Sequence, residues 1–466
     1  MTPPTIAVLP PPPARIHIVG IGGIGLSGLA QILHSLGYTV SGSDANASAQ
    51  TASLMAIGIP VALGHTDVER AAHADLVVST RAVLLADTAE IRAASVAGVP
   101  VVKRGEVLAM LANARRCVAV AGSHGKSTTC GMLVTALREL GADPSYAVGA
   151  VIGATGTNAA LADGDAMVVE ADEFDYAFLW LSPEVAIVTN VEFDHPDIFP
   201  DQQSYDAAFA QFATKLRPGG TLVLAADDPG CARLQAKIAT NLPGQVVTYG
   251  EGETSDWRLD RDAEGWQIKT PEGSLIRLAP AVPGRHNARN ATAALAALAA
   301  LGHDPATAAT ALTSFTGVGR RFEIKGEVGG VLVVDDYAHH PSEIRATLRA
   351  ARDWYPDRRL WAVFQPHTFS RTKALLGDFA AAFADADEVM ILDIYPARET
   401  DSLGISSANL RKLVPRECRA AGRPDEAAET LAAHVRDGDV VVTLGAGDIT
   451  VVGPSLLQRL RDRIPV

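Results

Sequence analysis

A glycine-rich segment with a lysine and two hydroxyl residues, GSHGKST, follows the apolar run RCVAVA and precedes a stretch with helical periodicity. We therefore predict a strand, a tight turn and a helix. Backbone N–H groups of such a turn can surround phosphate oxygens, and the N-terminus of the helix adds positive potential. Lys126 would contact the β- and γ-phosphates of a nucleotide, and the Ser127 hydroxyl would bind Mg²⁺. The nucleotide-contacting residues would be Gly122, Ser123, His124, Gly125, Lys126, Ser127 and Thr128.

The spacing of this segment departs from the standard phosphate-binding motif, because Val120 stands where an earlier glycine is expected. An ordinary turn with a surface lysine is the alternative interpretation. Turn, lysine, hydroxyl and helix nevertheless follow in the order that phosphate binding needs, so we favour a nucleotide site.

Acidic residues crowd the end of a second apolar run, AMVVE, and repel one another unless a cation or a basic partner lies close. They are Glu170, Asp172, Glu173 and Asp175. Asp194 and His195 follow another run, EVAIVTN, which we expect to be a neighbouring strand. Carboxylate oxygens with one imidazole suit Mg²⁺, so we predict a metal site. A solvated acidic loop and a histidine with only a local hydrogen bond are the alternatives.

Near the N-terminus, Gly20, Gly22 and Gly25 form a GxGxxG pattern directly after the apolar run RIHIV. Asp44 closes the next predicted strand, 19 residues beyond Gly25. This is the dinucleotide fingerprint and by itself indicates NAD. Any ligand with a pyrophosphate could use the same backbone amides, and a turn that serves only helix–strand packing is a further alternative.

Two loops rich in histidine and arginine, DDYAHHPSE and FQPHTFSRTK, each follow a predicted strand in the last third of the chain. They would place His339, His340 and Arg371 along one rim of a sheet. Exposed polar loops are the alternative, although two such loops at corresponding strand ends favour a binding site. The linker before them adds residues that could contact a base or phosphates, namely Asn287, Arg320 and Arg321.

Short apolar runs alternate with Ala-rich helical stretches throughout, which predicts parallel sheets covered on both faces. We expect a Pro-rich tail over residues 1–14 and three consecutive α/β modules over residues 15–115, 116–319 and 320–466. Alternating segments between Trp257 and Leu278 indicate antiparallel strands at the edge of the second module.

Composition narrows the possible partners. The net charge is −13, which argues against binding to nucleic acid or to an anionic membrane surface. Four cysteines without CxxC spacing make a disulfide framework or a zinc site improbable and favour a cytoplasmic location. No apolar run approaches the about 20 residues of a membrane-spanning helix, so we expect a soluble protein.

Taken together, GIGGIGLSGLAQIL, GSHGKSTT, EADE, the TN…DH strand end, GRHNARNATAA, GRRFE and DDYAHHPSE resemble the motifs of the Mur ligase family. The resemblance covers nearly all of residues 15–460. It implies a Rossmann-like N-terminal domain that binds a UDP-sugar, a P-loop-type central ATPase domain, and a Rossmann-like C-terminal domain for the amino acid and part of ATP. It also implies ATP-dependent amide-bond formation in cytoplasmic cell-wall precursor synthesis, through an acyl phosphate.

The resemblance assigns roles residue by residue. Lys126 matches the phosphate lysine, Ser127 and Glu173 match ligands of one Mg²⁺, and His195 matches a ligand of a second; Mn²⁺ is an expected substitute. Residues that match ATP contacts are Asn287, Arg320 and Asp336. Residues that match the amino-acid pocket are Tyr337, His339 and Arg371. The expected catalytic residues are Lys126, at the phosphate site, and His339 and Arg371. Residues that match the UDP-sugar region are Gly22, Gly23, Ile24, Gly25, Asp44 and Arg104.

Within the family, HIVGIGGIGLSGLA, FQPH…SRT and DIYPARE imply UDP-N-acetylmuramate and L-alanine as substrates beside ATP, in a monomer or homodimer. Thr368 departs from that pattern, because a basic residue is expected there near the amino-acid carboxylate. EADEFDYAF and NVEFDHPDIF instead resemble the relative that attaches a whole tripeptide. An NAD-dependent oxidoreductase and a non-enzymatic nucleotide-binding regulator are the alternatives from other classes.

Overall fold

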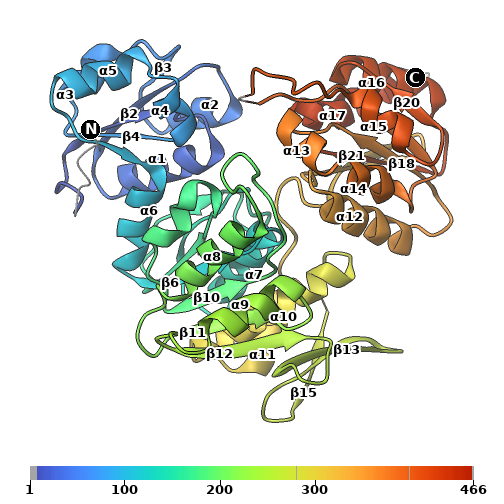
Figure 1. The fold of residues 1–466 in the computed structure, drawn as a ribbon, viewed down its shortest axis with the longest axis horizontal. Coiled ribbons are helices and arrows are strands. Elements are labelled where there is room, and N and C mark those ends of the chain that lie inside the picture. Colours follow the sequence, from blue (N-terminus) through green and yellow to red (C-terminus); the bar gives the residue numbers. More distant parts are fainter. Residues whose placement is uncertain (1–7, 280, 398, 464–466) are drawn as a thin grey trace. The chain divides into compact units, whose positions relative to one another are not determined.

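The computed structural model describes residues 8–279, 281–397 and 399–463. Its strands form three sheets packed with helices, which confirms the expected α/β fold class (Figure 1). The chain divides into two compact units. Unit 1 holds the first two sheets, and unit 2 holds the third sheet together with residues 193–202 and 281–289. The boundaries near residues 115 and 320 stay predictions.

Of the Pro-rich tail predicted for residues 1–14, residues 1–7 lie outside the described part of the chain. Leu9 and Ala14 pack against the hydrophobic core of the first sheet. The described end of this segment therefore contacts the N-terminal domain.

The first sheet has five parallel strands in the order β3-β2-β1-β4-β5. The strands are β1 (Arg15–Val19), β2 (Thr39–Asp44), β3 (Val61–Leu63), β4 (Leu76–Ser79) and β5 (Val101–Lys103). The helices are α1 (Ile24–Ser35), α2 (Ala49–Ala56), α3 (Val68–His73), α4 (Arg81–Leu85), α5 (Ala89–Val96) and α6 (Arg104–Asn113). The strand order reverses between β1 and β4, and ligands of such sheets bind outside the carboxyl ends of the strands at this point.

The second sheet has ten strands in the order β15-β14-β13-β12-β11-β10-β6-β9-β7-β8. The strands are β6 (Arg116–Ala121), β7 (Ser145–Ala147), β8 (Ala159–Ala160), β9 (Ala166–Glu170), β10 (Val185–Val188), β11 (Thr221–Ala225), β12 (Gln245–Gly250), β13 (Trp257–Asp262), β14 (Gly265–Lys269) and β15 (Leu275–Leu278). The helical segments are α7 (Lys126–Glu139), η1 (Phe174–Trp180), α8 (Gln202–Ala213), α9 (Pro229–Ile238), α10 (Arg285–Ala300) and α11 (Pro305–Leu312). The antiparallel pairing predicted for the edge of this module is confirmed in β13, β14 and β15.

One expected adjacency in this sheet is wrong. β9 and β10, which lie in the runs AMVVE and EVAIVTN, are not neighbours, because β6 pairs with both of them and lies between them. Apolar runs of similar length carry no information about which strand pairs with which. The acidic residues after β9 and the chain after β10 therefore flank the glycine-rich turn that follows β6.

The third sheet has six strands in the order β16-β17-β21-β18-β19-β20, of which only β16 pairs in antiparallel fashion. The strands are β16 (Glu323–Val328), β17 (Val331–Asp336), β18 (Arg359–Phe364), β19 (Glu388–Ile391), β20 (Cys418–Ala420) and β21 (Asp439–Leu444). The helical segments are α12 (Pro341–Trp354), α13 (Phe369–Ala374), α14 (Leu376–Ala380), η2 (Ala381–Phe383), α15 (Ser407–Leu413), α16 (Pro424–His434), η3 (Asp448–Val451) and α17 (Val452–Arg461). Separate hydrophobic cores cover the two faces, which explains the continuous apolar runs in its central strands.

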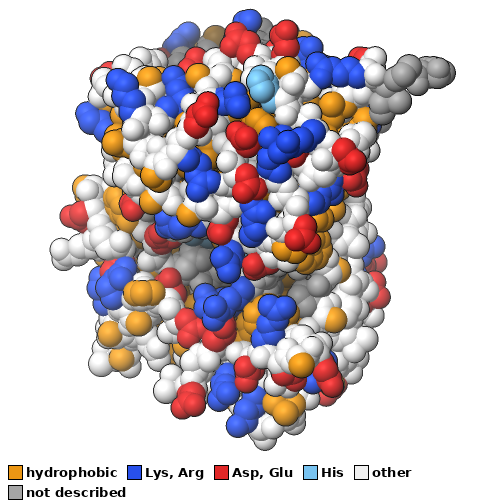
Figure 2. Space-filling view, turned by 90° about the vertical axis from the view of Figure 1, so that its right-hand side faces the viewer, with side chains coloured by type: hydrophobic (Ala, Val, Ile, Leu, Met, Phe, Trp, Pro, Cys, Tyr) orange, Lys and Arg blue, Asp and Glu red, His pale blue; other side chains and the backbone are white. Residues whose placement is uncertain are grey.

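Charged side chains of both signs are mixed on the face drawn in Figure 2, and hydrophobic side chains lie between them in small groups. Among the described residues, no helix is long and apolar enough to cross a lipid bilayer.

We expect Asp439→Ala to destabilise unit 2. The buried Asp439 Oδ2 accepts hydrogen bonds from Arg359 Nη2 (2.6 Å) and from the indole N–H of Trp361 (3.1 Å). Removing the carboxylate leaves both donors without this acceptor, at a cost of about 3 kcal/mol in the free energy of unfolding. Urea unfolding measures the loss, with the exposed Asp357→Ala as control. Equal unfolding free energies for the two variants would contradict this expectation.

Candidate active site

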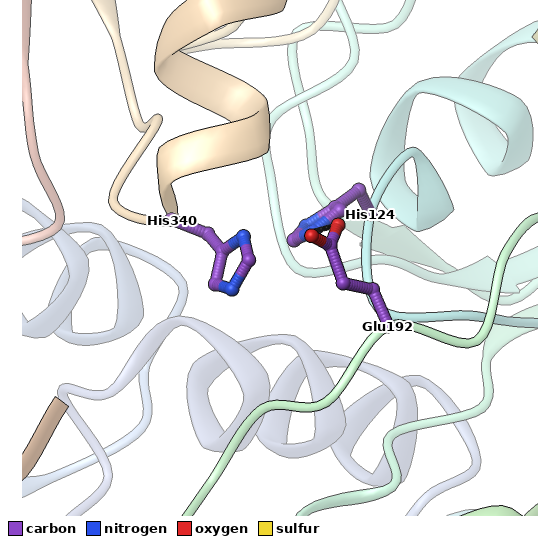
Figure 3. Close-up of side chains that lie close together, drawn as sticks. All are labelled: His124, Glu192 and His340. Carbon is purple, nitrogen blue, oxygen red and sulfur yellow. Dashed lines mark hydrogen bonds and ion pairs between the residues drawn. The ribbon is translucent and has the colours of Figure 1, made fainter. Parts of the chain in front are cut away.

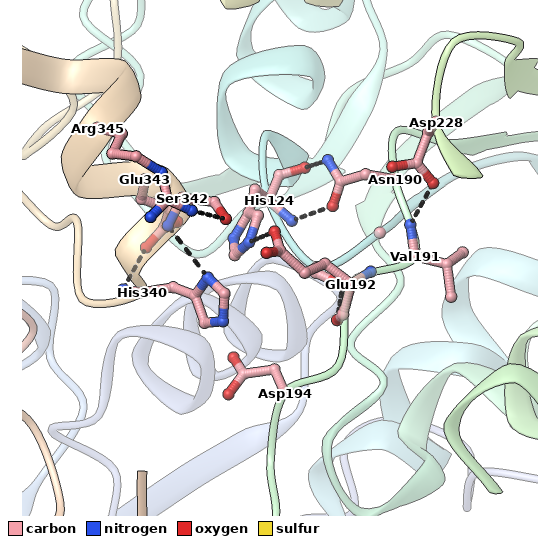
Figure 4. A network of polar contacts seen from close by, with 12 residues as sticks. His124, Asn190, Val191, Glu192, Asp194, Asp228, His340, Ser342, Glu343 and Arg345 are labelled. Carbon is pink, nitrogen blue, oxygen red and sulfur yellow. Dashed lines mark hydrogen bonds and ion pairs between the residues drawn. The ribbon is translucent and has the colours of Figure 1, made fainter. Parts of the chain in front are cut away.

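The turn after β6 is built around two glycines with left-handed backbones. Gly122 has a φ of +129°, and Gly125, which precedes α7, has a φ of +84°. A Cβ atom on Gly122 would lie 2.1 Å from Thr189 Oγ1, so a larger residue does not fit there. His124 N donates to Asn190 Oδ1 (2.9 Å), and Asn190 Nδ2 donates to the His124 carbonyl (3.1 Å; Figure 4). The predicted strand, turn and helix are confirmed, and residues after β10 hold the turn in place.

Lys126, the first residue of α7, folds back over this turn and forms an ion pair with Glu173. Its Nζ lies 2.9 Å from Glu173 Oε2 and donates to the carbonyls of Gly122 and Ser123. The Glu173 side chain is only 1% exposed. Burial alone would lower the pKa of Lys126, but Glu173 and Asp172 outweigh it and raise the pKa above its ordinary value. The turn therefore carries a lysine that stays charged at neutral pH beside a buried carboxylate.

Polar contacts that sequence reasoning missed connect Glu173 to the other side of the turn. The Tyr205 hydroxyl donates to Glu173 Oε1 (3.2 Å) and lies 2.9 Å from Ser123 Oγ. Ser123 Oγ donates to the Glu192 carbonyl (2.6 Å), and Glu192 Oε2 lies 3.1 Å from His124 Nε2 (Figure 3). Glu192 belongs to the NVEFDHPDIF motif, but its contacts with Ser123 and His124 can be recognised only in the folded structure. No feature of the sequence around Tyr205 indicates a functional residue.

The carboxylates around this turn fit a divalent cation. Glu170 ends β9, and its Oε1 is buried without a hydrogen-bond partner among the described residues. Ser127 lies buried in the first turn of α7. Carboxylate and hydroxyl oxygens are donors that Mg²⁺ accepts, so Ser127 and Glu173 fit a magnesium site. His195 belongs to unit 2, where its backbone N–H donates to Asp194 Oδ1 (2.7 Å).

Basic side chains from the N-terminal part of unit 1 neutralise the other acids after β9. Arg104 Nη2 lies 3.0 Å from Asp172 Oδ2, and Asp175 pairs with both Arg81 (2.8 Å) and Lys103 (2.7 Å). Asp175 has a φ of +54°, a left-handed conformation that is strained for a residue with a side chain. Basic partners therefore relieve the charge repulsion that the sequence predicts here.

The GxGxxG loop of the first sheet is fastened to the end of β2. The Ser43 carbonyl accepts from Gly20 N (2.8 Å) and Ile21 N (2.9 Å), and Asp44 Oδ2 accepts from Gly22 N (2.8 Å). α1 then begins with Gly23 as its N-cap and no side-chain cap. A Cβ atom on Gly25 would lie 2.8 Å from Arg104 Nη1. The structure thus brings together the glycines, Asp44 and Arg104 that the sequence assigned to the UDP-sugar region.

In unit 2, a buried carboxylate holds Arg371. Its Nε and Nη2 donate to Asp194 Oδ1 (2.9 and 2.8 Å), and its Nη1 lies 3.3 Å from His367 Nδ1. Burial alone would raise the pKa of Asp194, but Arg371 and then His195 outweigh it and hold the pKa well below its ordinary value. Arg371 and Asp194 were both predicted from the sequence, but their pairing and the contact with His367 were not.

Tyr337 and His339 lie close to the same arginine-bearing loop. Their ring centroids are 5.2 Å apart, and the rings of His339 and His367 are 6.0 Å apart. His339 Nδ1 lies 3.0 Å from the Tyr337 carbonyl and 3.3 Å from Glu343 Oε2. Burial lowers the pKa of His339 to about 3, although Glu343 opposes the shift. The imidazole is therefore neutral at pH 7. The neighbouring His340 caps α12 by accepting from Ser342 N (3.4 Å; Figure 4).

The residues predicted to contact ATP outside the phosphate turn all belong to unit 2, and they are Asn287, Arg320 and Asp336. Arg320 pairs with the buried Asp335 (3.1 Å), and its guanidinium carbon lies 5.0 Å from the centre of the Tyr337 ring. Burial raises the pKa of Asp336 to about 6, although Arg321 favours its charged form. Asn287 is buried, and its Nδ2 donates to the Pro283 carbonyl.

Thr368, which departs from the expected sequence pattern, is the N-cap residue of α13. Its side chain accepts from Arg371 N (3.4 Å), and its N–H donates to the Tyr395 carbonyl (2.9 Å). Its φ of +67° is unusual for a β-branched residue. Thr368 therefore fixes the turn from which Arg371 projects. Arg398 of the DIYPARE motif lies outside the described residues.

Family models match three successive parts of the chain. The Mur ligase family catalytic domain matches residues 15–116, the Mur ligase middle domain residues 120–298, and the Mur ligase glutamate ligase domain residues 320–447. The chain belongs to the Mur ligase family. This membership does not favour the NAD-dependent oxidoreductase that the GxGxxG pattern alone indicates.

Individual relatives are similar over nearly the whole length. The UDP-N-acetylmuramate–L-alanine ligase of Frankia casuarinae is 44% identical, with 96% of this chain and 97% of the relative covered. The enzyme of the same name from Mycobacterium marinum is 43% identical, with 98% and 97% covered. Among solved structures, the UDP-N-acetylmuramate-alanine ligase MurC from Thermotoga maritima is 29% identical with a TM-score of 0.80, covering 96% of this chain and 99% of its own. A murein peptide ligase from Psychrobacter arcticus is 25% identical with a TM-score of 0.75, covering 97% and 100%.

We expect the stability of the wild-type protein to fall between pH 7 and pH 4.5 more steeply than that of His339→Gln. The folded pKa of about 3 lies below the ordinary value of 6.5, so the neutral ring favours the folded state above pH 6.5. That contribution is lost as the pH falls from 6.5 towards 3, because the unfolded chain binds the proton first. The difference should reach about 2–3 kcal/mol at pH 4.5.

Urea unfolding of both proteins at the two pH values measures this difference. His434→Gln is the matched control, because His434 lies exposed on α16 of the same unit. Parallel pH dependences for the wild type and His339→Gln would show that the buried ring does not titrate in this way.

Proposed function

We propose that this protein joins L-alanine to UDP-N-acetylmuramate at the expense of ATP, as a cytoplasmic step of cell-wall precursor synthesis. The observation that carries the proposal is the glycine-rich turn with Lys126 and the buried Glu173. Relatives named for this reaction are 43–44% identical over nearly the whole chain, which supports L-alanine and UDP-N-acetylmuramate as substrates.

The chemistry needs ATP because a free carboxylate does not acylate an amine at neutral pH. The lactyl carboxylate of the sugar attacks the γ-phosphorus and releases ADP, which gives an acyl phosphate. The amine of L-alanine then attacks the acyl carbon through a tetrahedral intermediate and expels phosphate. The first step brings two anions together, so charge neutralisation around the phosphates is the main demand on the protein.

Lys126 meets part of that demand. Its Nζ donates to the carbonyls of Gly122 and Ser123, and a phosphate oxygen is a better partner for an ammonium group than a neutral carbonyl. We propose that Lys126 turns from these carbonyls to the β- and γ-phosphates. Ser127 and Glu173 would hold one Mg²⁺ and His195 a second. A bound Mg²⁺ supplies positive charge to the phosphate oxygens.

The nucleotide sugar is proposed to lie at the carboxyl end of the first sheet. The amides at the start of α1 and the guanidinium of Arg104 can hold its pyrophosphate. Arg104 now pairs with Asp172, so an anionic ligand would compete with that carboxylate.

For the amino acid we propose a pocket of Tyr337, His339 and Arg371 in unit 2. Arg371 is oriented by Asp194, and the neutral His339 can accept a hydrogen bond from the amine. A pKa of about 3 makes His339 a weak base, so orientation of the amine is the role that fits. Asn287, Arg320 and Asp336 are the further proposed contacts to ATP.

Attachment of a tripeptide is the second candidate. EADEFDYAF and NVEFDHPDIF favour it, and so does the similarity to the murein peptide ligase. The identity to that structure is 25%, against 44% to relatives named for L-alanine, so we place it second.

Phosphate release with different amino substrates tests the proposal. We expect ATP consumption that requires both UDP-N-acetylmuramate and L-alanine, with lower rates for glycine and L-serine. A rate with the tripeptide that exceeds the rate with L-alanine would favour the second candidate, attachment of a tripeptide. ATP consumption without the sugar nucleotide would overturn both.

We expect Lys126→Ala to abolish ADP formation, with a loss of activity of about 10³-fold or more, while binding of UDP-N-acetylmuramate changes less than twofold. The side chain neutralises charge in the phosphoryl-transfer step and lies outside the glycine loop of the first sheet. Coupled ADP release and calorimetric binding of the sugar nucleotide measure the two effects. Lys237→Ala on the surface of α9 is the control. Preserved turnover in Lys126→Ala would refute this role.

A further inference from the structure

A group of mostly buried polar side chains is connected to the GxGxxG loop through Ser43 and takes no part in the proposed reaction. Glu90, in the first turn of α5, is fully buried, as are His17 on β1 and Ser43 on β2. His65, just after β3, is partly exposed. The four residues come from β1, β2, α5 and the loop after β3.

Glu90 is the centre of this group. Its Oε2 accepts a hydrogen bond from Ser43 Oγ (2.6 Å), and its Oε1 accepts one from Asp67 N (2.7 Å). His17 Nε2 lies 3.7 Å from Oε1. His65 Nδ1 lies 3.8 Å from Oε2 and 3.0 Å from Ser43 Oγ. The carboxylate is thus hydrogen-bonded to the end of β2 and to the N-terminus of α3, and Ser43 links it to His65 after β3.

The carboxylate is held in its charged form by these contacts. Burial alone would raise the pKa of Glu90, but His17, Ser43 and the backbone N–H of Asp67 outweigh it, so the pKa lies below its ordinary value. A buried anion in a domain core is costly unless it is fully hydrogen-bonded. Glu90 lies near the carboxyl ends of the strands, where the sugar nucleotide is proposed to bind, so we infer a role in binding besides one in stability.

Ser43 connects Glu90 to the GxGxxG loop, because its hydroxyl is hydrogen-bonded to Glu90 and its carbonyl to the loop. The Ser43 carbonyl accepts from Gly20 N and Ile21 N, and the next residue, Asp44, accepts from Gly22 N. The amides that follow Gly22 open α1, where the pyrophosphate is proposed to bind. A displacement of the β2 end would therefore move both the loop amides and Asp44.

We propose that Glu90 is a positioning residue for the sugar nucleotide: through Ser43 and His65 it fixes the ends of β2 and β3, and through Ser43 the amides of the GxGxxG loop. The inference rests on the proposed function, because it takes the first sheet to bind a UDP-sugar. It assigns Glu90 no contact with the ligand. Glu90→Gln tests it sharply, since an amide can accept at only one of the two positions where the carboxylate accepts from Ser43 and Asp67.

The experiment measures binding of UDP-N-acetylmuramate to the full chain by calorimetry without ATP, together with KM and kcat for each substrate. We expect Glu90→Gln to weaken sugar-nucleotide binding about tenfold and Ser43→Ala to weaken it severalfold. KM for ATP and kcat at saturating sugar nucleotide should stay within twofold. Glu69→Gln is the matched control, because Glu69 lies exposed in the first turn of α3.

Three outcomes decide against the inference or its basis. Unchanged sugar-nucleotide binding in both variants would overturn the positioning role. A parallel loss of kcat and of affinity for all substrates would show a merely structural carboxylate and also overturn it. If Glu90→Gln does not fold, Ser43→Ala alone decides in the same way. A wild-type chain that does not bind UDP-N-acetylmuramate would overturn the proposed function itself.

Discussion

The buried ion pair between Lys126 and Glu173 is the interaction on which the central domain depends. The side chain of Lys126, the first residue of α7, is only 17% exposed, and a lysine is rarely withdrawn so far from water without a charged partner. Glu173 makes its burial tolerable, and Lys126 does the same for Glu173. The charge of each side chain is balanced by the other, and both side chains also contact polar neighbours. ATP with its cation would offer each of them a new partner.

The segment that carries Glu173 is also fixed from the other side. Asp172 and Asp175 pair with Arg104, Arg81 and Lys103 from the first domain. Asp175 has a strained, left-handed backbone, and its side chain forms two of these ion pairs, with Arg81 and with Lys103. Within unit 1, the proposed sugar-nucleotide and phosphate sites are therefore joined by one short segment. An anion that draws Arg104 away from Asp172 would act on the same segment that positions Glu173.

The sequence predicted those parts of the fold and site that are local along the chain. Strand, turn and helix around Lys126 follow from consecutive residues, and so does the strand that ends at Asp44. Contacts between distant segments could not be predicted. β6 separates β9 from β10, and Asp194 pairs with Arg371 across 177 positions, because apolar runs of similar length and single charged residues do not specify their partners. Tyr205, Glu192 and Glu90 were missed for the same reason.

Thr368 replaces the basic residue expected at its position, yet the turn before α13 and the position of Arg371 are still well defined. A basic residue at this position would add a second cation near Arg371, whereas threonine caps α13 and holds the turn before it. The capping hydroxyl and the Asp194 carboxylate together fix the direction of the arginine side chain. Since two of its nitrogens already bond to Asp194, Arg371 has little capacity left for a bidentate grip on a carboxylate. In the proposed amino-acid pocket, recognition should therefore depend more on Tyr337 and the neutral ring of His339 than on a pair of cations.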